Sequence, residues 1–188
     1  MKGFFTKGEV EEVKNKTKGR IFSCVSCGLY KGSEHPKMEP QGKFKKRILN
    51  IGEAPGRVEE KLNKYWKGKT GRLLREVYTE FGIDIDEDCL NINAVSCFKN
   101  GKPTPYEIAC CRKKVLKVIE EYQPNVIILL GNSALHSVLG GHWKKDLGSI
   151  TKWRGFTIPD RIYKCWICPV FHPSFVIRGD IEAKTIWK

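Results

Sequence analysis

The sequence lacks any apolar run long enough for a signal peptide or a membrane-spanning helix, and it contains no internal repeat or low-complexity segment. We therefore expect an intracellular, cytoplasmic protein that does not act in a membrane. Acidic residues are also scarce: 21 Asp and Glu stand against 34 Lys and Arg, which leaves a formal net charge of +13. This surplus favours a polyanionic partner, most commonly a nucleic acid, over the alternative that the lysines only keep the protein soluble.

A length of 188 residues suffices for one compact domain with its own core, and nothing in the composition calls for a second domain. Hydrophobic residues make up 40% of the chain, which indicates a folded protein. Residues 1–20 are rich in lysine and have little apolar periodicity. We expect a basic, flexible arm over residues 1–20, followed by a single domain over residues 21–188 that is monomeric.

Eight cysteines are many for a chain of this length. In a reducing compartment they favour metal or cluster ligation over disulfide bonds. Cys24 and Cys27 have the two-residue spacing that lets both thiolates reach one metal ion or cluster. Cys165 and Cys168 are expected on opposite faces of a strand, where they cannot chelate together. We interpret Cys89 as a core residue.

Four short apolar segments have the character of buried strands. They span residues 48–51, 90–95, 126–130 and 163–171. The segments expected to be helical span residues 71–81, residues 105–123, a stretch that opens at residue 131, and residues 177–188. Residues 140–159 are expected to form a loop. The alternation of strands and helices predicts an α/β fold, a three-layer αβα sandwich with a central, mostly parallel four-stranded sheet.

A capping box at Thr104 and Glu107, with Pro105 at the first helical position, predicts that a helix begins at Pro105. On this helix Cys111 falls on the apolar, inward face, whereas Cys110 lies about 100° around the axis. A further cysteine follows the second predicted strand. The candidate ligands of a [4Fe–4S] cluster or a structural zinc ion are therefore Cys24, Cys27, Cys97 and Cys111.

Three of the predicted strands end in a polar residue or a special turn. Glu53 lies in a Gly-Glu-Ala-Pro-Gly turn, Asn93 lies near the end of the second strand, and His172 follows the last one. Because the carboxyl ends of parallel strands meet at one edge of a sheet, these side chains and Trp66 are expected to form a pocket for a planar, hydrogen-bonding ligand such as a nucleobase. The alternatives are a solvated glutamate, a satisfied core asparagine and a capping histidine.

Several short motifs occur in a fixed order between Phe22 and Arg178. They are Cys24-x-x-Cys27, Gly52-Glu53-Ala54-Pro55-Gly56, Trp66-Lys67-Gly68-x-x-Gly71, Asn93-x-x-x-Cys97, Pro105-x-Glu107-Ile108-x-x-Cys111, Leu130-Gly131-x-x-Ala134, Arg154-Gly155 and His172-Pro173-Ser174. With these motifs the chain resembles the iron–sulfur uracil-DNA glycosylases, family 4 of the uracil-DNA glycosylase superfamily.

The resemblance implies a reaction and three residue roles. The reaction is hydrolysis of the bond between uracil and deoxyribose in DNA, which leaves an abasic site for base excision repair; the target base must first leave the stack. By this analogy Glu53 orients or activates the water, and Asn93 reads the edge of the uracil. His172 stabilises the negative charge that grows on the O2 atom of the departing base. We expect a monofunctional enzyme.

The resemblance also implies contacts with the DNA backbone. Backbone groups of Ala54, Pro55 and Gly56, together with Ser174, would hold phosphates near the lesion. Either Val176 or Ile177 would wedge into the vacated stack. At the four candidate cysteines the resemblance favours a [4Fe–4S] cluster over zinc, as a structural brace beside the DNA surface. The DNA substrate is expected to be single- or double-stranded.

The chain departs from the family pattern at two places that matter for function. Trp66 stands where the family usually has Phe, so the pocket could accept another deaminated or modified base. Ser96 precedes the third cysteine, and the loop after that cysteine is short, which leaves Cys110 as a substitute ligand for Cys111. An alternative from another class is a non-catalytic iron–sulfur relative that only binds DNA.

Overall fold

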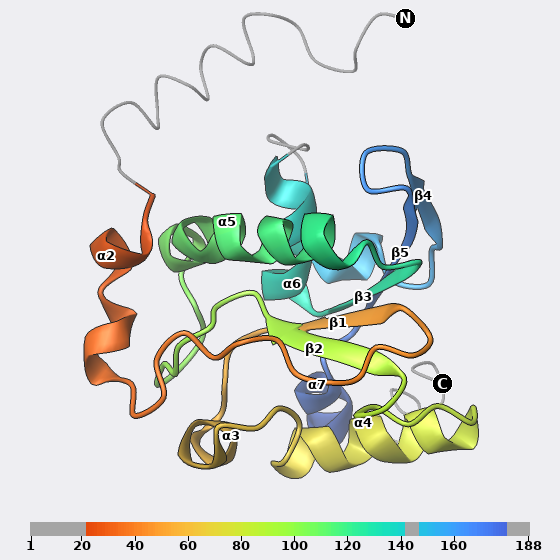
Figure 1. The fold of residues 1–188 in the computed structure, drawn as a ribbon, viewed down its shortest axis with the longest axis horizontal. Helices are drawn as coiled ribbons and strands as arrows, with labels where there is room; N and C mark the ends of the chain where they lie inside the picture. The colour runs from red at the N-terminus through yellow and green to blue at the C-terminus, as the bar shows by residue number, and fades with distance from the viewer. Residues whose placement is uncertain (1–21, 142–146, 180–188) are drawn as a thin grey trace, which may run out of the picture.

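The computed structural model describes residues 22–141 and 147–179. A five-stranded sheet lies at its centre, in the order β2-β1-β3-β5-β4 (Figure 1). The strands are β1 (Ile48–Gly52), β2 (Cys89–Asn93), β3 (Val126–Leu130), β4 (Ile158–Asp160) and β5 (Cys165–Val170). All neighbouring pairs are parallel except β4 with β5. The predicted mostly parallel sheet is confirmed, but it has five strands rather than four.

The additional strand, β4, overlaps the end of the segment that was predicted to be a loop, residues 140–159. It has three residues, contains Pro159 and occupies the edge of the sheet. Proline removes a ladder donor and is tolerated at such an edge. A strand of three residues is too short to show alternating hydrophobicity, so this strand could not be predicted from the sequence.

Helices cover both faces of the sheet, which confirms the three-layer arrangement (Figure 1). One face carries α5 (Pro105–Tyr122) and α6 (Asn132–Val138), and the other carries α4 (Lys69–Glu80) and α7 (Pro173–Arg178). The remaining helical segments are α2 (Cys24–Cys27), η1 (Leu29–Gly32), α3 (Arg57–Leu62), η2 (Leu139–Gly141) and η3 (Ile150–Lys152). Within the described ranges no helix is long and apolar enough to cross a membrane.

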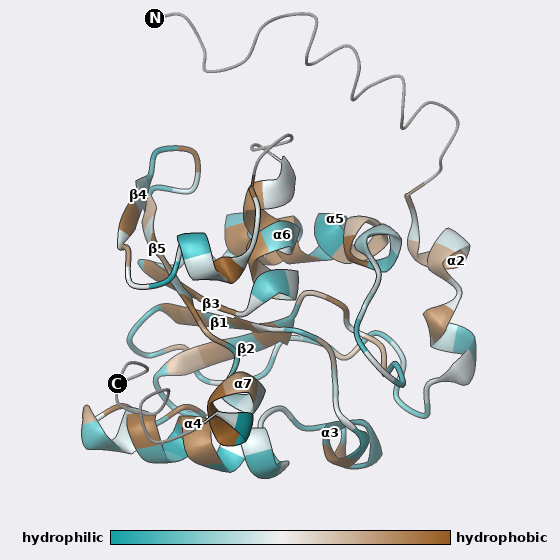
Figure 2. Ribbon diagram, turned by 180° about the vertical axis from the view of Figure 1, so that it is seen from behind, coloured by the Kyte–Doolittle hydropathy of each residue, from teal (hydrophilic) through white to brown (hydrophobic). Residues whose placement is uncertain are grey.

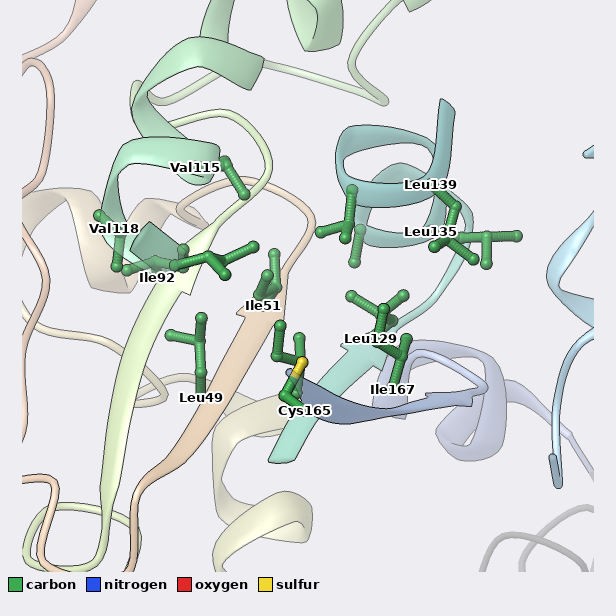
Figure 3. Packing of buried hydrophobic residues seen from close by; sticks show 14 of the residues in the cluster. Leu49, Ile51, Ile92, Val115, Val118, Leu129, Leu135, Leu139, Cys165 and Ile167 are labelled. Carbon is green, nitrogen blue, oxygen red and sulfur yellow. The ribbon is translucent and has the colours of Figure 1, made fainter. Parts of the chain in front are cut away.

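Two apolar clusters fix the sheet between its helical layers. The first joins sheet residues such as Ile51 and Leu129 to Val115 of α5 and Leu135 of α6 (Figure 3). The second lies on the opposite face and includes Leu74 of α4. In Figure 2 the central strands are coloured mostly as hydrophobic, as expected for a sheet that is covered on both faces. Burial of these side chains at about 25 cal/mol per Å² is the main force that holds the layers together.

Helix starts were predicted with mixed success. The capping box of α5 is formed: Thr104 Oγ1 accepts a hydrogen bond from the Glu107 N–H at 3.3 Å, and Glu107 Oε2 accepts one from the Thr104 N–H at 2.6 Å. The last helix was placed wrongly, because α7 begins at Pro173 rather than at residue 177. The predicted arm over residues 1–20 and the end of the predicted last helix, residues 180–188, lie outside the described residues.

Candidate active site

The structure brings four predicted site residues around one cavity at the carboxyl edge of the sheet. The cavity has a volume of about 130 Å³ and is lined by Glu53, Trp66, Asn93 and His172, among others. Strand register explains part of this arrangement, since Gly52 of β1 pairs directly with Asn93 of β2. A cavity of about 150 Å³ is enough to bind benzene, so this one has the size of a single six-membered ring. We call it the base pocket.

Glu53 presents its carboxylate to the base pocket from the end of β1. Its Oε2 atom accepts a hydrogen bond from the Ser133 hydroxyl at 3.0 Å. Within residues 22–141 and 147–179, no group donates to the other oxygen, Oε1. Ser133 lies in the first turn of α6, directly after β3, and was not predicted as a site residue. The expectation that site residues follow the carboxyl ends of parallel strands, which identified Glu53, also applies to Ser133.

His172 caps α7 and has a defined tautomer. Its Nδ1 atom accepts a hydrogen bond from the backbone N–H of Ser174 at 3.2 Å. Because a backbone N–H can only donate, the neutral imidazole must carry its proton on Nε2. Burial lowers the pKa of His172, although the nearby Glu53 carboxylate opposes this change. At neutral pH the ring is therefore an uncharged Nε2–H donor.

The backbone on both sides of the pocket leaves no room for larger residues. A Cβ atom at Gly131 would lie 2.9 Å from the Cβ of His172, and Gly131 also has a positive φ of 91°. A Cβ at Gly52 would lie 2.3 Å from Asn93 Oδ1 and 2.8 Å from Trp66 Cη2. Glycine is required at both positions because the backbone approaches the pocket side chains closely.

Asn93 is only 5% exposed. Buried amides are usually satisfied by protein groups. Across the part of the chain that the structure describes, however, the Asn93 side chain has no hydrogen-bond partner. Its amide therefore remains available to a ligand in the base pocket, which argues against the alternative of a satisfied core residue.

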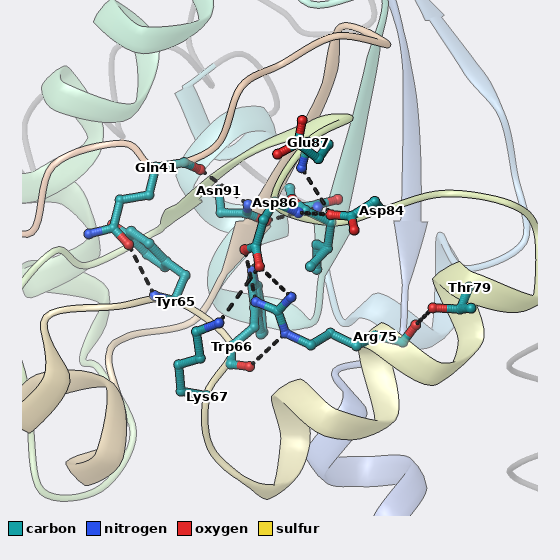
Figure 4. Close-up of polar contacts among 12 residues, drawn as sticks. Gln41, Tyr65, Trp66, Lys67, Arg75, Thr79, Asp84, Asp86, Glu87 and Asn91 are labelled. Atoms are coloured by element: carbon teal, nitrogen blue, oxygen red, sulfur yellow. Dashed lines mark hydrogen bonds and ion pairs between the residues drawn. The ribbon is translucent and has the colours of Figure 1, made fainter.

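Trp66 forms a buried wall of the pocket and is 6% exposed. The indole Nε1–H donates to Asn91 Oδ1 at 2.9 Å (Figure 4). Asn91 was not predicted to belong to the site. Whether Trp66 stacks on a base stays a prediction.

A larger groove of about 540 Å³ adjoins the base pocket and shares Glu53 and His172 with it. Its basic lining residues are Lys102, Arg112, His136 and Arg178. Arg112 donates to the carbonyl groups of His136 and Ser137 and so also fixes the end of α6. Surplus positive charge beside a ring-sized pocket suits the backbone of a polynucleotide. We call this feature the basic groove.

The segment after His172 differs from the prediction. Ser174 lines the basic groove, and its hydroxyl lies 2.8 Å from His172 Nδ1. Val176 is 1% exposed, so the prediction that it wedges into DNA is wrong for the described structure: it faces the interior from α7. Ile177 is half-buried. Phe175 is 48% exposed, lines the basic groove and packs on Phe171 with ring centroids 4.5 Å apart.

The turn predicted to hold phosphates reaches the pocket only in part. Ala54 and Gly56 line the base pocket, and Gly56 is exposed. Pro55 is buried and does not line it. Gly56 also precedes α3, a helix that the sequence did not predict because its six residues show no apolar periodicity.

The four candidate cysteines lie near one another on the side of the molecule where α2 packs against α5. Burial raises the pKa of Cys111 to about 11, and the thiols of Cys27, Cys97 and Cys24 add to the increase. Such mutual electrostatic effects require the thiols to be near one another. The backbone N–H of Lys37 also donates to Cys97 Sγ at 3.3 Å. All four candidates are thiols, the donor type that an iron–sulfur cluster or a zinc ion requires.

The burial of Cys110 and Cys111 is the reverse of what the sequence predicted. Cys110 is 5% exposed and Cys111 is half-buried, so the assignment of Cys111 as the inward residue of the two is wrong. The reason is that α2 packs against α5 and buries a second side of this helix. Cys110 also contributes to the raised pKa of Cys27. Among the described residues, no three His, Cys, Asp or Glu side chains converge closely enough to hold one metal ion.

Cys165 and Cys168 lie on opposite faces of β5, as predicted. Cys165 belongs to the cluster below α5 and α6, whereas the Cys168 thiol lies near Tyr78 of α4, whose pKa is raised mainly by burial. Cys89 is fully buried, which confirms it as a core residue.

These features define an α/β protein with a ring-sized polar pocket beside a basic groove, the arrangement expected of an enzyme that acts on a base within a polynucleotide. The sequence matches the family model described as the uracil DNA glycosylase superfamily over residues 39–188. The chain belongs to this family.

Curated relatives agree with the family match. The chain is 36% identical to a type-4 uracil-DNA glycosylase of Thermotoga maritima over 177 residues, which cover 93% of this chain and 87% of the relative. It is 29% identical to one of Archaeoglobus fulgidus, with 84% and 79% covered, and 32% identical to one of Saccharolobus solfataricus, with 88% and 78% covered.

Proposed function

We propose that this protein is a uracil-DNA glycosylase that hydrolyses the N-glycosidic bond of uracil in DNA. The single observation that carries the proposal is the base pocket, where Glu53, Asn93 and His172 line one ring-sized cavity. The family match and the activity for which the relatives are named support the same reaction.

The proposed hydrolysis uses a carboxylate and a neutral imidazole. The Ser133 hydroxyl holds Glu53 through Oε2, which leaves Oε1 to orient a water molecule. As the bond between C1′ and N1 breaks, its electron pair leaves with uracil, and negative charge grows on the base oxygen O2. The Nε2–H of His172 donates to that oxygen and stabilises the charge. Water oxygen then bonds to C1′ and releases its proton to Glu53.

Base and backbone recognition follow from the remaining lining residues. The free amide of Asn93 is suited to the donor and acceptor atoms of a uracil edge, and Trp66 closes the pocket. We propose that phosphates contact the exposed turn at Gly56 and Ser174, whose hydroxyl would exchange its hydrogen bond to His172 Nδ1 for one to a phosphate oxygen. Because Val176 is buried, we assign the residue that fills the vacated stack to exposed Phe175, with Ile177 as the remaining predicted candidate.

The proposed enzyme is monofunctional. A glycosylase that also cuts the strand needs an amine that attacks C1′ and forms a Schiff base. Among the described residues that line the base pocket there is no lysine. We therefore expect an intact strand with an abasic site as the product, and cleavage only after alkali treatment.

A [4Fe–4S] cluster is the group we propose for the four-cysteine site. Cys24, Cys27, Cys97 and Cys111 would hold it, and Cys110 is the substitute for Cys111. When bound, the cluster supplies a structural cross-link rather than a catalytic group. α2 packs against α5, and the Lys37 N–H donates to Cys97 Sγ in the loop that follows β2.

The test is release of uracil from an oligonucleotide that contains one deoxyuridine. The purified protein should convert it to an alkali-labile product, and Glu53→Gln should slow the single-turnover rate by at least about 10²-fold. Glu121→Gln, which changes an exposed glutamate on α5, is the matched control and should keep the rate. Absence of an abasic product from the unaltered protein, on both single- and double-stranded DNA, would contradict the proposal.

A further inference from the structure

A network of buried polar side chains lies directly behind the base pocket, on the face of the sheet that carries α4. Asn91 is its centre and is 1% exposed. Its Nδ2 atom donates to the carbonyl groups of Gln41 at 3.1 Å and Ile85 at 3.0 Å. Because carbonyl groups only accept, these two bonds fix the orientation of the amide and leave Oδ1 as the acceptor on the other side.

That acceptor holds the indole of Trp66. The Trp66 Nε1–H donates to Asn91 Oδ1 at 2.9 Å, and Asn50 Nδ2 donates to the same oxygen at 3.0 Å. Asn50 is held in turn by the Tyr78 hydroxyl at 2.6 Å. Strand register places these groups together, since Asn50 pairs with Asn91 just as Gly52 pairs with Asn93.

The main chain of Trp66 is held as firmly as its ring (Figure 4). Trp66 has a positive φ of 58°, a conformation that costs a non-glycine residue about 1–3 kcal/mol and persists only where the surroundings impose it. Arg75 Nε donates to the Trp66 carbonyl at 3.2 Å, and the Arg75 guanidinium is anchored by two bonds to Asp86. Gly71 lies so close that a Cβ there would be 2.1 Å from the same carbonyl.

We propose that Asn91 is a positioning residue that sets base selectivity by holding Trp66 as the size-limiting wall of the base pocket. Both side chains crowd Gly52, since a Cβ atom added at this glycine would lie 2.8 Å from Cη2 of the Trp66 indole and 2.3 Å from Asn93 Oδ1. Trp66 is the largest side chain that lines this pocket of about 130 Å³, so the position of its indole limits the size of the base that the pocket admits. The inference rests on the proposed function and names its selectivity: uracil is accepted and thymine is rejected.

The test compares excision of uracil and thymine, each opposite guanine, by Asn91→Leu in two backgrounds. With Trp66 present, loss of the acceptor releases the indole, and the uracil-to-thymine ratio of kcat/KM should fall by at least about tenfold, within the range that one methyl group contributes. In the Trp66→Phe background the same change should alter the ratio less than about threefold, because phenylalanine has no N–H to be held. Thermal unfolding verifies that each variant folds.

Each outcome decides the proposal. An equal change of the ratio in both backgrounds, or no change in either, overturns it while leaving uracil excision intact. If Asn91→Leu does not fold, Asn91→Ser, whose side chain is too short to reach the indole, replaces it in both backgrounds. Unaltered protein that releases neither base contradicts the proposed function itself and the selectivity that rests on it.

Discussion

Replacement of Gly52 by alanine probes the base pocket with a single methyl group. The added Cβ would lie 2.3 Å from Asn93 Oδ1 and 2.8 Å from Trp66 Cη2, both inside the closest contacts that real Cβ atoms make. Asn93 would have to move by about 1 Å to restore ordinary contact, and a misplacement of that size costs about 10²-fold in rate. Trp66 cannot yield easily, because its indole and its carbonyl are both hydrogen-bonded.

The assay for Gly52→Ala is single-turnover release of uracil, combined with thermal unfolding. We expect a rate loss of about 10²-fold and a loss of about 1–3 kcal/mol in the free energy of unfolding, the usual cost of overpacking. Gly32→Ala is the matched control: a Cβ at Gly32 meets no atom within 4 Å, and its φ lies outside the left-handed region. If both variants excise uracil at the same rate, the pocket is not arranged as described.

Three further predictions concern the groups around the pocket and the cysteines. Ser133→Ala should lower kcat about tenfold with little change in KM, because Glu53 loses a hydrogen bond to a charged group; an unchanged kcat contradicts this role. Because burial lowers the pKa of His172, the unfolded chain binds protons more readily. The free energy of unfolding, measured in urea, should therefore fall as the pH drops below about 6.5, and His172→Gln should reduce that dependence. Cys111→Ser should lose most of its bound iron on analysis of the anaerobically purified protein, whereas Cys110→Ser should retain it; the reverse result makes Cys110 the ligand.

Sequence patterns predicted the parts of the site that depend on strand order. Asn93 is the last residue of β2, Glu53 and His172 follow β1 and β5, and parallel strands must align their carboxyl ends. The N-cap role of His172 also had a local signal, since Pro173 occupies the first helical position, but the expected helix was placed four residues too late. That shift put Val176 in a loop, whereas α7 turns it into the core.

Tertiary packing decided what local pattern could not. The faces of α5 are an example: helical periodicity distinguishes Cys110 from Cys111 only if one side of the helix is covered, and α2 covers a second side. Hydrogen bonds between side chains that are far apart in the sequence are equally hard to predict from a local pattern. Ser133 reaches Glu53 across 80 residues, and neither residue type specifies the other.

The two asparagines of β2 show which part of a residue's role can be inferred from its position in a strand. Asn91 and Asn93 are two residues apart, so both must face the same side of the sheet. Their roles differ because the loop that carries Trp66 returns to the sheet and uses the amide of Asn91, while that of Asn93 stays free for a ligand. A buried indole N–H without a partner would cost about 1–3 kcal/mol. Tryptophan at position 66 therefore requires a polar acceptor in the strand behind it, which phenylalanine would not, and the identity of residue 91 is tied to the pocket wall rather than to the core.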